Sequence, residues 1–181
     1  MVLPSSRSLE VLLLADEPTR SRVCAALALV PSRVSVVQTG AALMARVWER
    51  VPDLIIVGAV LERDAVAAVC RSVRQFLQTP ILVVEAGASA DERIGWLDGG
   101  ADDVLALLAS SPAELVARCH ALLRRQQRQQ RRDPAALRLQ ALNMQLDLVE
   151  RRLHLPEKQV LDLSAAQVWL LALFFSYGER I

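Results

Sequence analysis

The chain has 181 residues, of which 53% are hydrophobic, so it can bury a sizeable core in one full domain plus a smaller unit. Its formal net charge of +1 excludes a uniformly basic nucleic-acid-binding protein but allows a local basic patch. No apolar run approaches the roughly 18 residues of a membrane-spanning helix, and the first seven residues lack the apolar core of a secretion signal. Three scattered cysteines without Cys-x-x-Cys spacing indicate reduced thiols, so we expect a cytoplasmic protein with no membrane partner.

Short apolar runs alternate with helical segments over the first two thirds of the chain. The expected strands lie at 9–14, at 34–37, within 52–61, at 81–85 and at 104–107. Apolar residues recur at helical spacing after each run, and Pro18, Ser89 and the 111–114 stretch have the composition of helix starts. Five strand–helix units in this order predict an α/β fold with a doubly wound parallel sheet.

A basic, polar stretch (RRQQRQQRR, 124–132) follows the last of these units. It is interpreted either as a solvated extension of the last helix or as a linker, and a phosphate-backbone contact is the functional alternative to a solvated hinge. Beyond it, four short strand-like pieces precede Ser164, which begins an apolar helix. The sequence therefore predicts a domain at 1–124, a basic linker or helix extension at 125–136 and a small β-rich unit at 137–181.

Several stretches of the chain match those of one bacterial family in order and spacing. They are LLLADEP, PDLIIVGAVL, TPILVV, DERIGWLDGGADDVL and SSPAELVARCHALLRR, followed by MQLDLVERRLHL and VLDLSAAQVWLLALFFSYGERI. At these residues the chain resembles two-component response regulators of the OmpR/PhoB type. The resemblance implies a flavodoxin/CheY-like (βα)5 receiver domain. It also implies the N-terminal strands and first helix of a winged-helix effector domain.

The family's reactive positions carry unsuitable side chains in this sequence. In the family, an aspartate after the third strand accepts a phosphoryl group, an acidic pair helps to hold Mg²⁺, and a Ser/Thr and a Lys contact the phosphoryl oxygens. By resemblance, the acceptor position falls on Gly58 and the acidic pair on Ala15 and Asp16. The Ser/Thr position falls on Glu85, and the Lys position falls at or next to Leu107. The resemblance therefore implies a degenerate phosphorylation pocket, as in an atypical or pseudo-receiver.

This pocket is expected to have no catalytic residue and no cofactor. Asp16 and Glu85 could offer oxygen ligands to a hard cation, but two carboxylates without the central aspartate make a poor cage for Mg²⁺. Asp64 is an alternative acceptor, although it lies past the strand end at a helix start. No metal site, Ser/His/Asp arrangement or phosphate-binding loop is visible in the sequence, so we do not expect an enzyme.

A second surface keeps the charges of the family pattern. In the family, the fourth helix, fifth strand and fifth helix form a two-fold dimer face crossed by reciprocal salt bridges. The matching positions here are Arg93, Asp103, Glu114 and Arg118. The resemblance implies that Arg93 pairs with Glu114, and Asp103 with Arg118, across a homodimer whose apolar neighbours supply most of the affinity. Ordinary solvated helix charges are the alternative.

The effector part of this sequence has no recognition helix and no wing. DNA binding through a complete winged helix would therefore need a longer natural chain. Trp169, Leu173 and Phe174 on the apolar helix would lack the partners that usually cover them. This pattern indicates either a fragment or a helix face that contacts a partner, such as a second copy of the chain.

Two functional hypotheses follow from these observations. The leading hypothesis is a phosphorylation-independent transcriptional regulator that dimerises constitutively. The alternative is an interaction or decoy module that pairs with another response regulator and does not itself bind DNA. An enzyme on a flavodoxin-like fold has only the fold analogy in its favour.

Overall fold

The computed structural model describes residues 8–58, 63–132, 138–141, 144–148, 150–156 and 159–177. Its larger unit contains a five-stranded parallel sheet in the order β2-β1-β3-β4-β5. The strands are β1 (Leu9–Leu14), β2 (Ser32–Val37), β3 (Leu54–Gly58), β4 (Ile81–Glu85) and β5 (Asp103–Ala106). The helices are α1 (Thr19–Leu27), α2 (Gly40–Glu49), α3 (Arg63–Arg74), α4 (Ala90–Asp98) and α5 (Pro112–Arg132).

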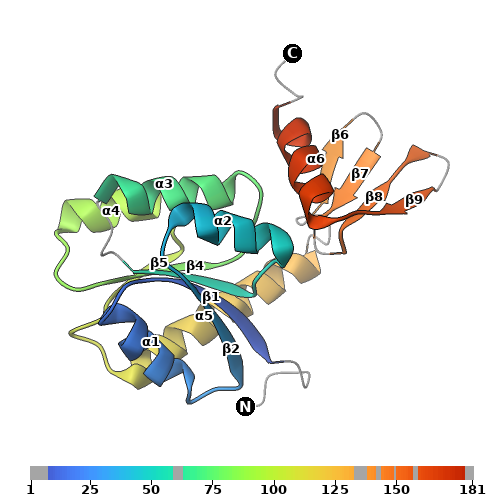
Figure 1. The fold of residues 1–181 in the computed structure, drawn as a ribbon. Coiled ribbons are helices and arrows are strands. Elements are labelled where there is room, and N and C mark those ends of the chain that lie inside the picture. The colour runs from blue at the N-terminus through green and yellow to red at the C-terminus, as the bar shows by residue number, and fades with distance from the viewer. Residues whose placement is uncertain are drawn as a thin grey trace.

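Alternate residues of the strands pack on opposite faces of the sheet. Leu13, Ile56 and Leu82 belong to the core on the side of α1 and α5. Ile55 and Val83 belong to the core on the side of α2, α3 and α4 (Figure 1). Burial on both faces explains why these strands are continuous apolar runs in the sequence. The strand order is that of a CheY-like doubly wound fold, so the predicted fold class is confirmed.

Side-chain caps fix the helix starts that the sequence predicts for α4 and α5. Ser89 and Glu92 form a complete capping box at the start of α4. At α5, the hydroxyl of Ser111 accepts a hydrogen bond from the N–H of Glu114 at 3.2 Å. These caps satisfy backbone donors that the first helical turn leaves without partners.

The first helix is shorter than the helical spacing of Val23, Leu27 and Val30 predicts. Pro18 occupies the N-cap position, and α1 ends at Leu27 instead of near Val30. The N–H groups of Leu29 and Val30 each bond to a carbonyl three residues earlier, at 3.2 and 3.1 Å. This tighter turn ends the α-helix and leads the chain into β2.

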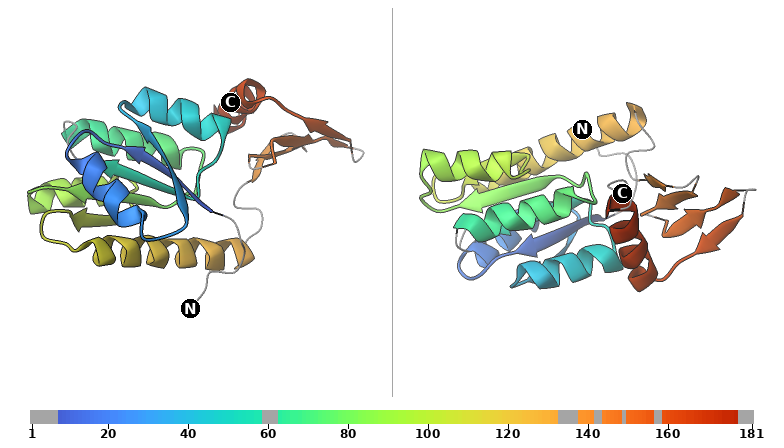
Figure 2. Two further views of the ribbon diagram at one scale, coloured as in Figure 1. Left: turned by 60° about the horizontal axis from the view of Figure 1, so that its bottom comes forward. Right: turned by 90° about the horizontal axis from the view of Figure 1, so that it is seen from above.

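The basic stretch is helical, because α5 runs without a break from Pro112 to Arg132. A helix extension is therefore what the structure contains at residues 124–132. Among the α5 residues whose side chains are described, Leu122 and Leu123 are the last that are buried against the sheet. Beyond them the helix projects past the sheet, as both views in Figure 2 show. The division of the chain into domains at 124 and 136 stays a prediction.

A small antiparallel sheet follows, with the strand order β6-β7-β8-β9. Its elements are β6 (Arg138–Ala141), β7 (Met144–Asp147), β8 (Arg152–His154), β9 (Val160–Asp162) and helix α6 (Ala165–Tyr177). Leu146 and Leu153 of the sheet and Val168 and Ala172 of α6 are buried in the same apolar cluster as the α2–α4 side of the larger unit. Helix α6 lies against α2. No helix within the described residues is long and apolar enough to cross a membrane.

Candidate functional site

The positions expected to form the reactive pocket lie at one edge of the parallel sheet. Leu14 of β1 is in register with Val57 of β3, so the next residues, Ala15 and Gly58, lie side by side. Gly58 is in turn in register with Val84 on β4. This edge is formed by the carboxyl ends of the strands, where doubly wound proteins place their ligands. The structure therefore places these positions at one edge of the sheet, whereas their role there stays a prediction.

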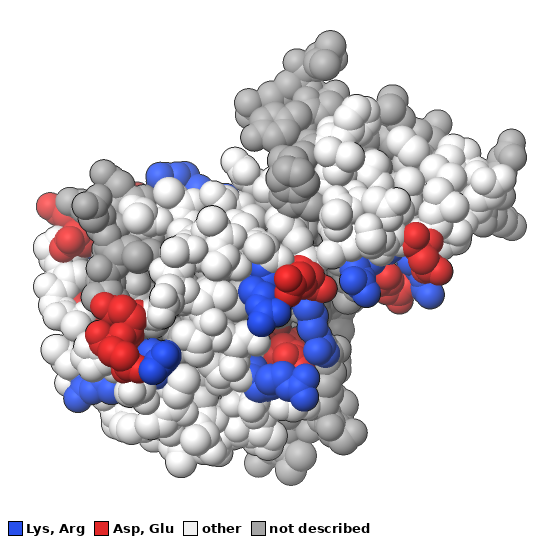
Figure 3. Space-filling model, viewed as in Figure 1, with Lys and Arg blue, Asp and Glu red and all other residues white. Residues whose placement is uncertain are grey.

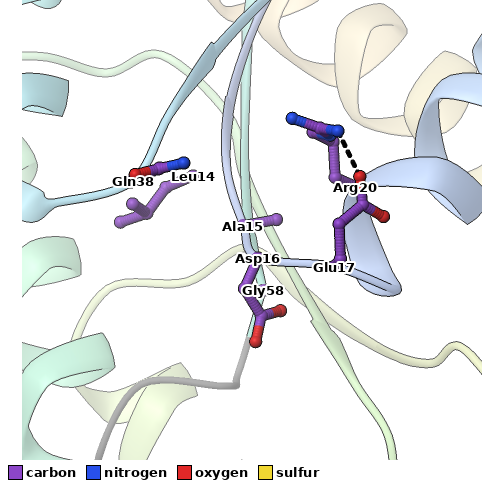
Figure 4. A pocket seen from close by; sticks show the side chains of 7 residues that line it. All are labelled: Leu14, Ala15, Asp16, Glu17, Arg20, Gln38 and Gly58. Carbon is purple, nitrogen blue, oxygen red and sulfur yellow. Dashed lines mark ion pairs between the residues drawn. The ribbon is translucent and has the colours of Figure 1, made fainter.

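A cavity of about 340 Å³ opens at this edge, between the ends of β1 and β3 (Figure 4). Its lining consists of Leu14, Ala15, Asp16, Glu17, Arg20, Gln38 and Gly58. Of the predicted pocket positions, the structure thus brings Ala15, Asp16 and Gly58 together in this cavity. Because Gly58 has no side chain, β3 contributes only backbone to the lining.

The charged side chains of the cavity come from the end of β1 and the start of α1. Arg20 forms an ion pair with Glu17. A hydrogen bond with the Ser21 side chain and the charge of Arg20 lower the pKa of Glu17, so this carboxylate is ionised at neutral pH. In Figure 4, the Asp16 carboxylate lies beside Gly58 and points away from this ion pair. The lining of the cavity therefore contains the Asp16 carboxylate and the Glu17–Arg20 ion pair, whose two charges neutralise each other.

Sequence reasoning did not assign Arg20 and Gln38 to this cavity. Glu17 and Arg20 stand three residues apart at a helix start, which is a visible spacing for an ion pair. Gln38 directly follows the second strand, where no motif of the chain points to a function. Arg20 could thus have been found from its spacing, whereas Gln38 could be placed only by the fold.

Glu85 lies at the same edge of the sheet but faces its own loop. Its side chain is only 1% exposed. One carboxylate oxygen accepts hydrogen bonds from the N–H groups of Gly87 and of Ala88, the latter at 2.7 Å. The other oxygen has no hydrogen-bond partner and lies 3.4 Å from Nε of Arg93 on α4. Arg93 also donates to the carbonyl of Ala88 at 2.7 Å. We refer to Glu85, Gly87, Ala88 and Arg93 as the Glu85 cluster.

The Glu85 cluster separates this carboxylate from the cavity at β1 and β3. Glu85 does not belong to the lining of that cavity. Within the described residues, no group of three or more His, Cys, Asp or Glu side chains is arranged to hold a metal ion. The absence of a cofactor from this cavity stays a prediction. Asp64, the alternative acceptor, has no described side chain.

Leu107 follows β5 and is part of the apolar core. It is 8% exposed and packs in the cluster that contains Ala15 and Leu115. Its N–H donates a hydrogen bond to the carbonyl of Glu85 at 2.7 Å, which fixes the chain at the end of β5. The residue at this strand end therefore supplies packing and no positive charge.

The expected dimer-face charges form ion pairs within the single chain. Arg118 on α5 lies 2.7 Å from a carboxylate oxygen of Asp103 and 2.9 Å from one of Glu114. Hydrogen bonds with Asp103 and Glu114 raise the pKa of Arg118. Arg93 is engaged in the Glu85 cluster instead. The pairing of these residues between two copies stays a prediction, because the structure contains one chain.

The apolar helix α6 is partly covered by the rest of the chain. Val168 and Ala172 are 2% and 0% exposed, whereas Leu170 and Phe174 are 63% and 54% exposed. The side chains of Trp169 and Leu173 lie outside the described part of the structure. One stripe of α6 is therefore already packed, and the proposed contact of the helix with a partner remains a prediction.

The fold and the strand-end cavity define a receiver-like α/β domain followed by a small antiparallel sheet. The sequence model of the family described as "Transcription regulator GlnR, N-terminal domain" matches residues 9–123. The chain therefore belongs to this family.

Curated relatives are OmpR/PhoB-type response regulators, in agreement with the resemblance found in the sequence. The chain is 37% identical over 131 residues to the alkaline phosphatase synthesis transcriptional regulatory protein SphR of Synechococcus elongatus, covering 72% of this chain and 49% of that protein. It is 32% identical over 149 residues to the response regulator MprA of Mycobacterium sp. (strain KMS), covering 82% of this chain and 63% of the relative. The chain thus spans about half to five eighths of the length of these proteins.

Solved structures of receiver domains have the same fold. A response regulator of Chloroflexus aurantiacus superposes with a TM-score of 0.60 at 24% identity, over 65% of this chain and 99% of that one. The receiver domain of Klebsiella pneumoniae RstA, solved in its BeF3-activated form, superposes with a TM-score of 0.57 at 27% identity, over 64% and 98% of the two chains. The described residues between 9 and 123 therefore have the fold of a receiver domain.

Proposed function

We propose that this chain is a transcriptional regulator of the response-regulator type whose receiver domain works without phosphorylation. The observation that carries the proposal is Gly58, which stands at the end of β3 beside Ala15 and lines the strand-end cavity. Phosphoryl transfer to this position would need a carboxylate nucleophile, and glycine has none. The chain therefore acts as a binding and signalling protein and catalyses no reaction.

The charges around Gly58 also oppose phosphoryl chemistry. A phosphoryl group on a carboxylate is stabilised by a divalent cation and by a positively charged side chain. Asp16 supplies a lone carboxylate, and the guanidinium of Arg20 is already compensated by Glu17. At the end of β5, Leu107 is buried in the core. An anion entering this cavity would therefore meet a negative charge without a compensating cation.

The Glu85 cluster supports a receiver domain with one fixed state. The buried carboxylate holds the loop between β4 and α4 through two backbone N–H groups and lies close to Arg93 of α4. The Glu85 carboxylate thus places a permanent negative charge next to this loop. The position of α4 then depends on Glu85 and needs no added phosphoryl group.

The proposed dimer uses the face formed by α4, β5 and α5. Ile94 and Leu97 on α4 are 55% and 45% exposed, and Leu108 after β5 is 63% exposed. Burial of such apolar side chains in a symmetric contact would supply most of the affinity of the dimer. Exposed ion pairs contribute only about 0–1 kcal/mol each. Asp103, Glu114 and Arg118 would then lie at the polar rim of the contact.

One observation favours the alternative in which this face pairs with a different regulator. Asp103 and Glu114 share a single cation, Arg118, within the chain, and Arg93 is engaged by Glu85. The local excess of negative charge on β5 and α5 suits a partner that presents a basic surface at this position.

Sedimentation equilibrium, with and without beryllofluoride and Mg²⁺, tests the proposed function. We expect a dimer whose dissociation constant is the same under both conditions, because Gly58 has no carboxylate to bind the phosphoryl analogue. The substitution Leu97→Glu should weaken the dimer at least tenfold. Leu29→Glu, at a site 67% exposed on the other side of the sheet, is the matched control and should leave it unchanged.

Two results would contradict the proposal. A dimer that forms only with beryllofluoride and Mg²⁺ would show that a carboxylate such as Asp16 still accepts the phosphoryl group. A chain that is monomeric at high micromolar concentration would exclude constitutive homodimerisation. If that monomer forms a one-to-one complex with a co-expressed longer response regulator, the alternative replaces the leading proposal.

A further inference from the structure

The part of α5 that projects beyond the sheet carries arginines on one side. Positions 124, 125, 128, 131 and 132 are arginine. At about 100° per residue, these positions fall within an arc of roughly 120° around the helix axis. The arc lies opposite Leu115, Cys119 and Leu122, which face the sheet and are buried. We call the five positions the arginine stripe.

The described side chains of the arginine stripe are exposed and have no acidic partner. Arg124, Arg125 and Arg128 are exposed, and no ion pair among the described residues involves them. Most of the described arginines elsewhere pair with carboxylates of the chain, as Arg46 does with Glu49 at 2.7 Å. On the face that Figure 3 shows, basic and acidic residues lie next to one another in this way. Arg22 and Arg71 are in no ion pair of the described residues, but they lie on separate helices, α1 and α3. Arg124, Arg125 and Arg128 are thus left available for an external anion.

The arginine stripe also determines the sign of the net charge of the chain. The sequence holds 21 basic and 20 acidic residues, so without the five arginines it would hold 16 and 20, a formal net charge of −4. Residues 124–132 contain no acidic residue. Because the remaining chain has a net negative charge, the projecting helix is the segment with the largest local excess of positive charge and the one that favours a polyanion.

The helix dipole accounts for only part of this pattern. Positive side chains near a helix C-terminus are stabilising, but the effect falls off within the last turn. Positions 131 and 132 lie in that turn, whereas Arg124 and Arg125 lie about two turns earlier. Their placement on the same side of the helix therefore needs another reason.

We propose that the arginine stripe binds the phosphate backbone of duplex DNA without reading the base sequence. This inference rests on the proposed function as a transcriptional regulator. The stripe extends over about 12 Å of helix axis, which spans three to four nucleotides of one strand at about 3.4 Å each. Arginine forks bind phosphate oxygens well, and phosphate contacts position a protein on DNA without specifying sequence.

The composition of the opposite side of the helix argues against a lipid surface. Residues 126, 127, 129 and 130 are all glutamine, and they continue the side that faces the sheet in the earlier turns. An interfacial membrane helix would carry large apolar residues there. Electrostatic contact with a backbone needs no such apolar side.

The test is binding of a labelled DNA duplex of about 20 base pairs and arbitrary sequence, measured by fluorescence anisotropy between about 50 and 200 mM salt. The full chain is compared with the triple variant R124Q/R125Q/R128Q. We expect the slope of log K against log salt to become shallower by about 2 to 3 in the variant, since each lost phosphate contact removes about 0.9. The variant R124K/R125K/R128K keeps the charges and should retain most of the slope.

A matched control carries the same change in net charge elsewhere. The variant R22Q/R33Q/R71Q removes three exposed arginines from other elements and should keep the slope of the parent chain. Equal slopes for the stripe variant and this control would overturn the proposal, as would the absence of DNA binding at the lowest salt. Stronger binding of single-stranded RNA, or of phosphatidylserine vesicles, would also overturn it in favour of that ligand.

The DNA-binding experiment and sedimentation equilibrium together separate this inference from the proposed function. If the stripe binds DNA but beryllofluoride changes the dimer, the proposed phosphorylation independence is wrong and the DNA-binding inference stands. If beryllofluoride does not change the dimer and the slope of log K against log salt does not depend on the stripe, the DNA-binding inference is wrong and the proposed function stands.

Discussion

Gly58 and Glu85 are the last residues of the neighbouring strands β3 and β4, and they affect charge at this edge of the sheet in opposite ways. Gly58 removes a side chain from the cavity, whereas Glu85 places a buried carboxylate against the loop that leads to α4. A buried carboxylate is tolerated only where donors or cations compensate it. The N–H groups of Gly87 and Ala88, together with Arg93, supply that compensation.

Replacing Glu85 should destabilise the receiver domain. Glu85→Ala leaves two backbone N–H groups without their acceptor, and we expect the free energy of unfolding to fall by about 2–4 kcal/mol. Glu85→Gln keeps an acceptor oxygen but loses the charge, so a loss of about 1 kcal/mol is expected. Urea unfolding measures both values, and hydrogen exchange at Gly87 and Ala88 should accelerate in Glu85→Ala.

The matched control for this residue is Glu49→Ala. Glu49 is paired with Arg46 on the surface of α2, where its side chain is 57% exposed. Its removal should change the free energy of unfolding by no more than about 1 kcal/mol. Unchanged hydrogen exchange at Gly87 in Glu85→Ala would mean that the carboxylate does not hold this loop.

The cysteines of the receiver domain are structural thiols. Cys24, Cys70 and Cys119 form no disulfide. Burial raises the pKa of Cys70 to about 11 and that of Cys119 to about 12. Both groups therefore stay protonated at neutral pH, and their thiols fill the core as small apolar side chains.

At the scale of the elements, one network ties α3 to the starts of β4 and β5. Arg74 at the end of α3 donates to the carbonyl of Thr79 at 2.6 Å and pairs with Asp102. The Asp102 carboxylate also accepts a hydrogen bond from the N–H of Ile81 at 2.8 Å. Backbone and side-chain contacts of this network set the register of two strands at the edge opposite the cavity.

Removing Asp102 should weaken this junction. The two partners are 20% and 29% exposed, so we expect Asp102→Ala to lower the free energy of unfolding by about 1–3 kcal/mol. In a double-mutant cycle with Arg74→Ala, the two losses should be less than additive, since both variants break the same network. Asp98→Ala, at an exposed position on α4, is the control. Full additivity would show that Arg74 and Asp102 act independently.

The elements were predictable where apolar periodicity marks them and less so elsewhere. Strands β1, β3 and β4 appear as apolar runs because both faces of the sheet are covered there. The extension of α5 was left open, because residues 124–132 contain no apolar residue and so carry no periodic signal. Helix α1 ended early through backbone hydrogen bonds that leave no mark in the side-chain pattern.

The candidate site was predictable in position and less so in geometry. Strand order alone places Ala15, Asp16 and Gly58 at one edge of the sheet. The orientation of Glu85 depends on two loop N–H groups, one of them from Gly87 at a φ of 122°. Such a loop conformation is a property of the folded backbone, and the spacing of residues in the sequence does not encode it directly.

For the whole molecule, the shared core between the two units has a thermodynamic consequence. Val168 and Ala172 of α6 and Leu146 of β7 belong to the same apolar cluster as the α2–α4 side of the receiver domain. Two units that bury side chains against each other stabilise each other's folded state. The small sheet is therefore expected to open together with the receiver domain.

Native-state hydrogen exchange tests this coupling. We expect the amides of Leu146 and Leu153 to open with a free energy within about 1 kcal/mol of that for Leu13 and Ile56 in the parallel sheet. Ala172→Glu, which places a charge in the shared cluster, should lower protection in the small sheet by several kcal/mol on the same scale. Early exchange of the small sheet in the unaltered chain would show that the two units fold independently.

Because α5 is continuous, a small tilt at its start would displace its far end by several ångströms. Helix α5 begins beside the Asp103–Arg118 pair and ends at Arg132, so one continuous helix joins the proposed dimer face to the projecting tip. Its 21 residues extend about 30 Å. A tilt of about 10° at the first turns would move the tip by about 5 Å, more than one nucleotide step along a DNA strand. Small adjustments between paired receiver domains would thus be amplified by leverage at the far end of this helix.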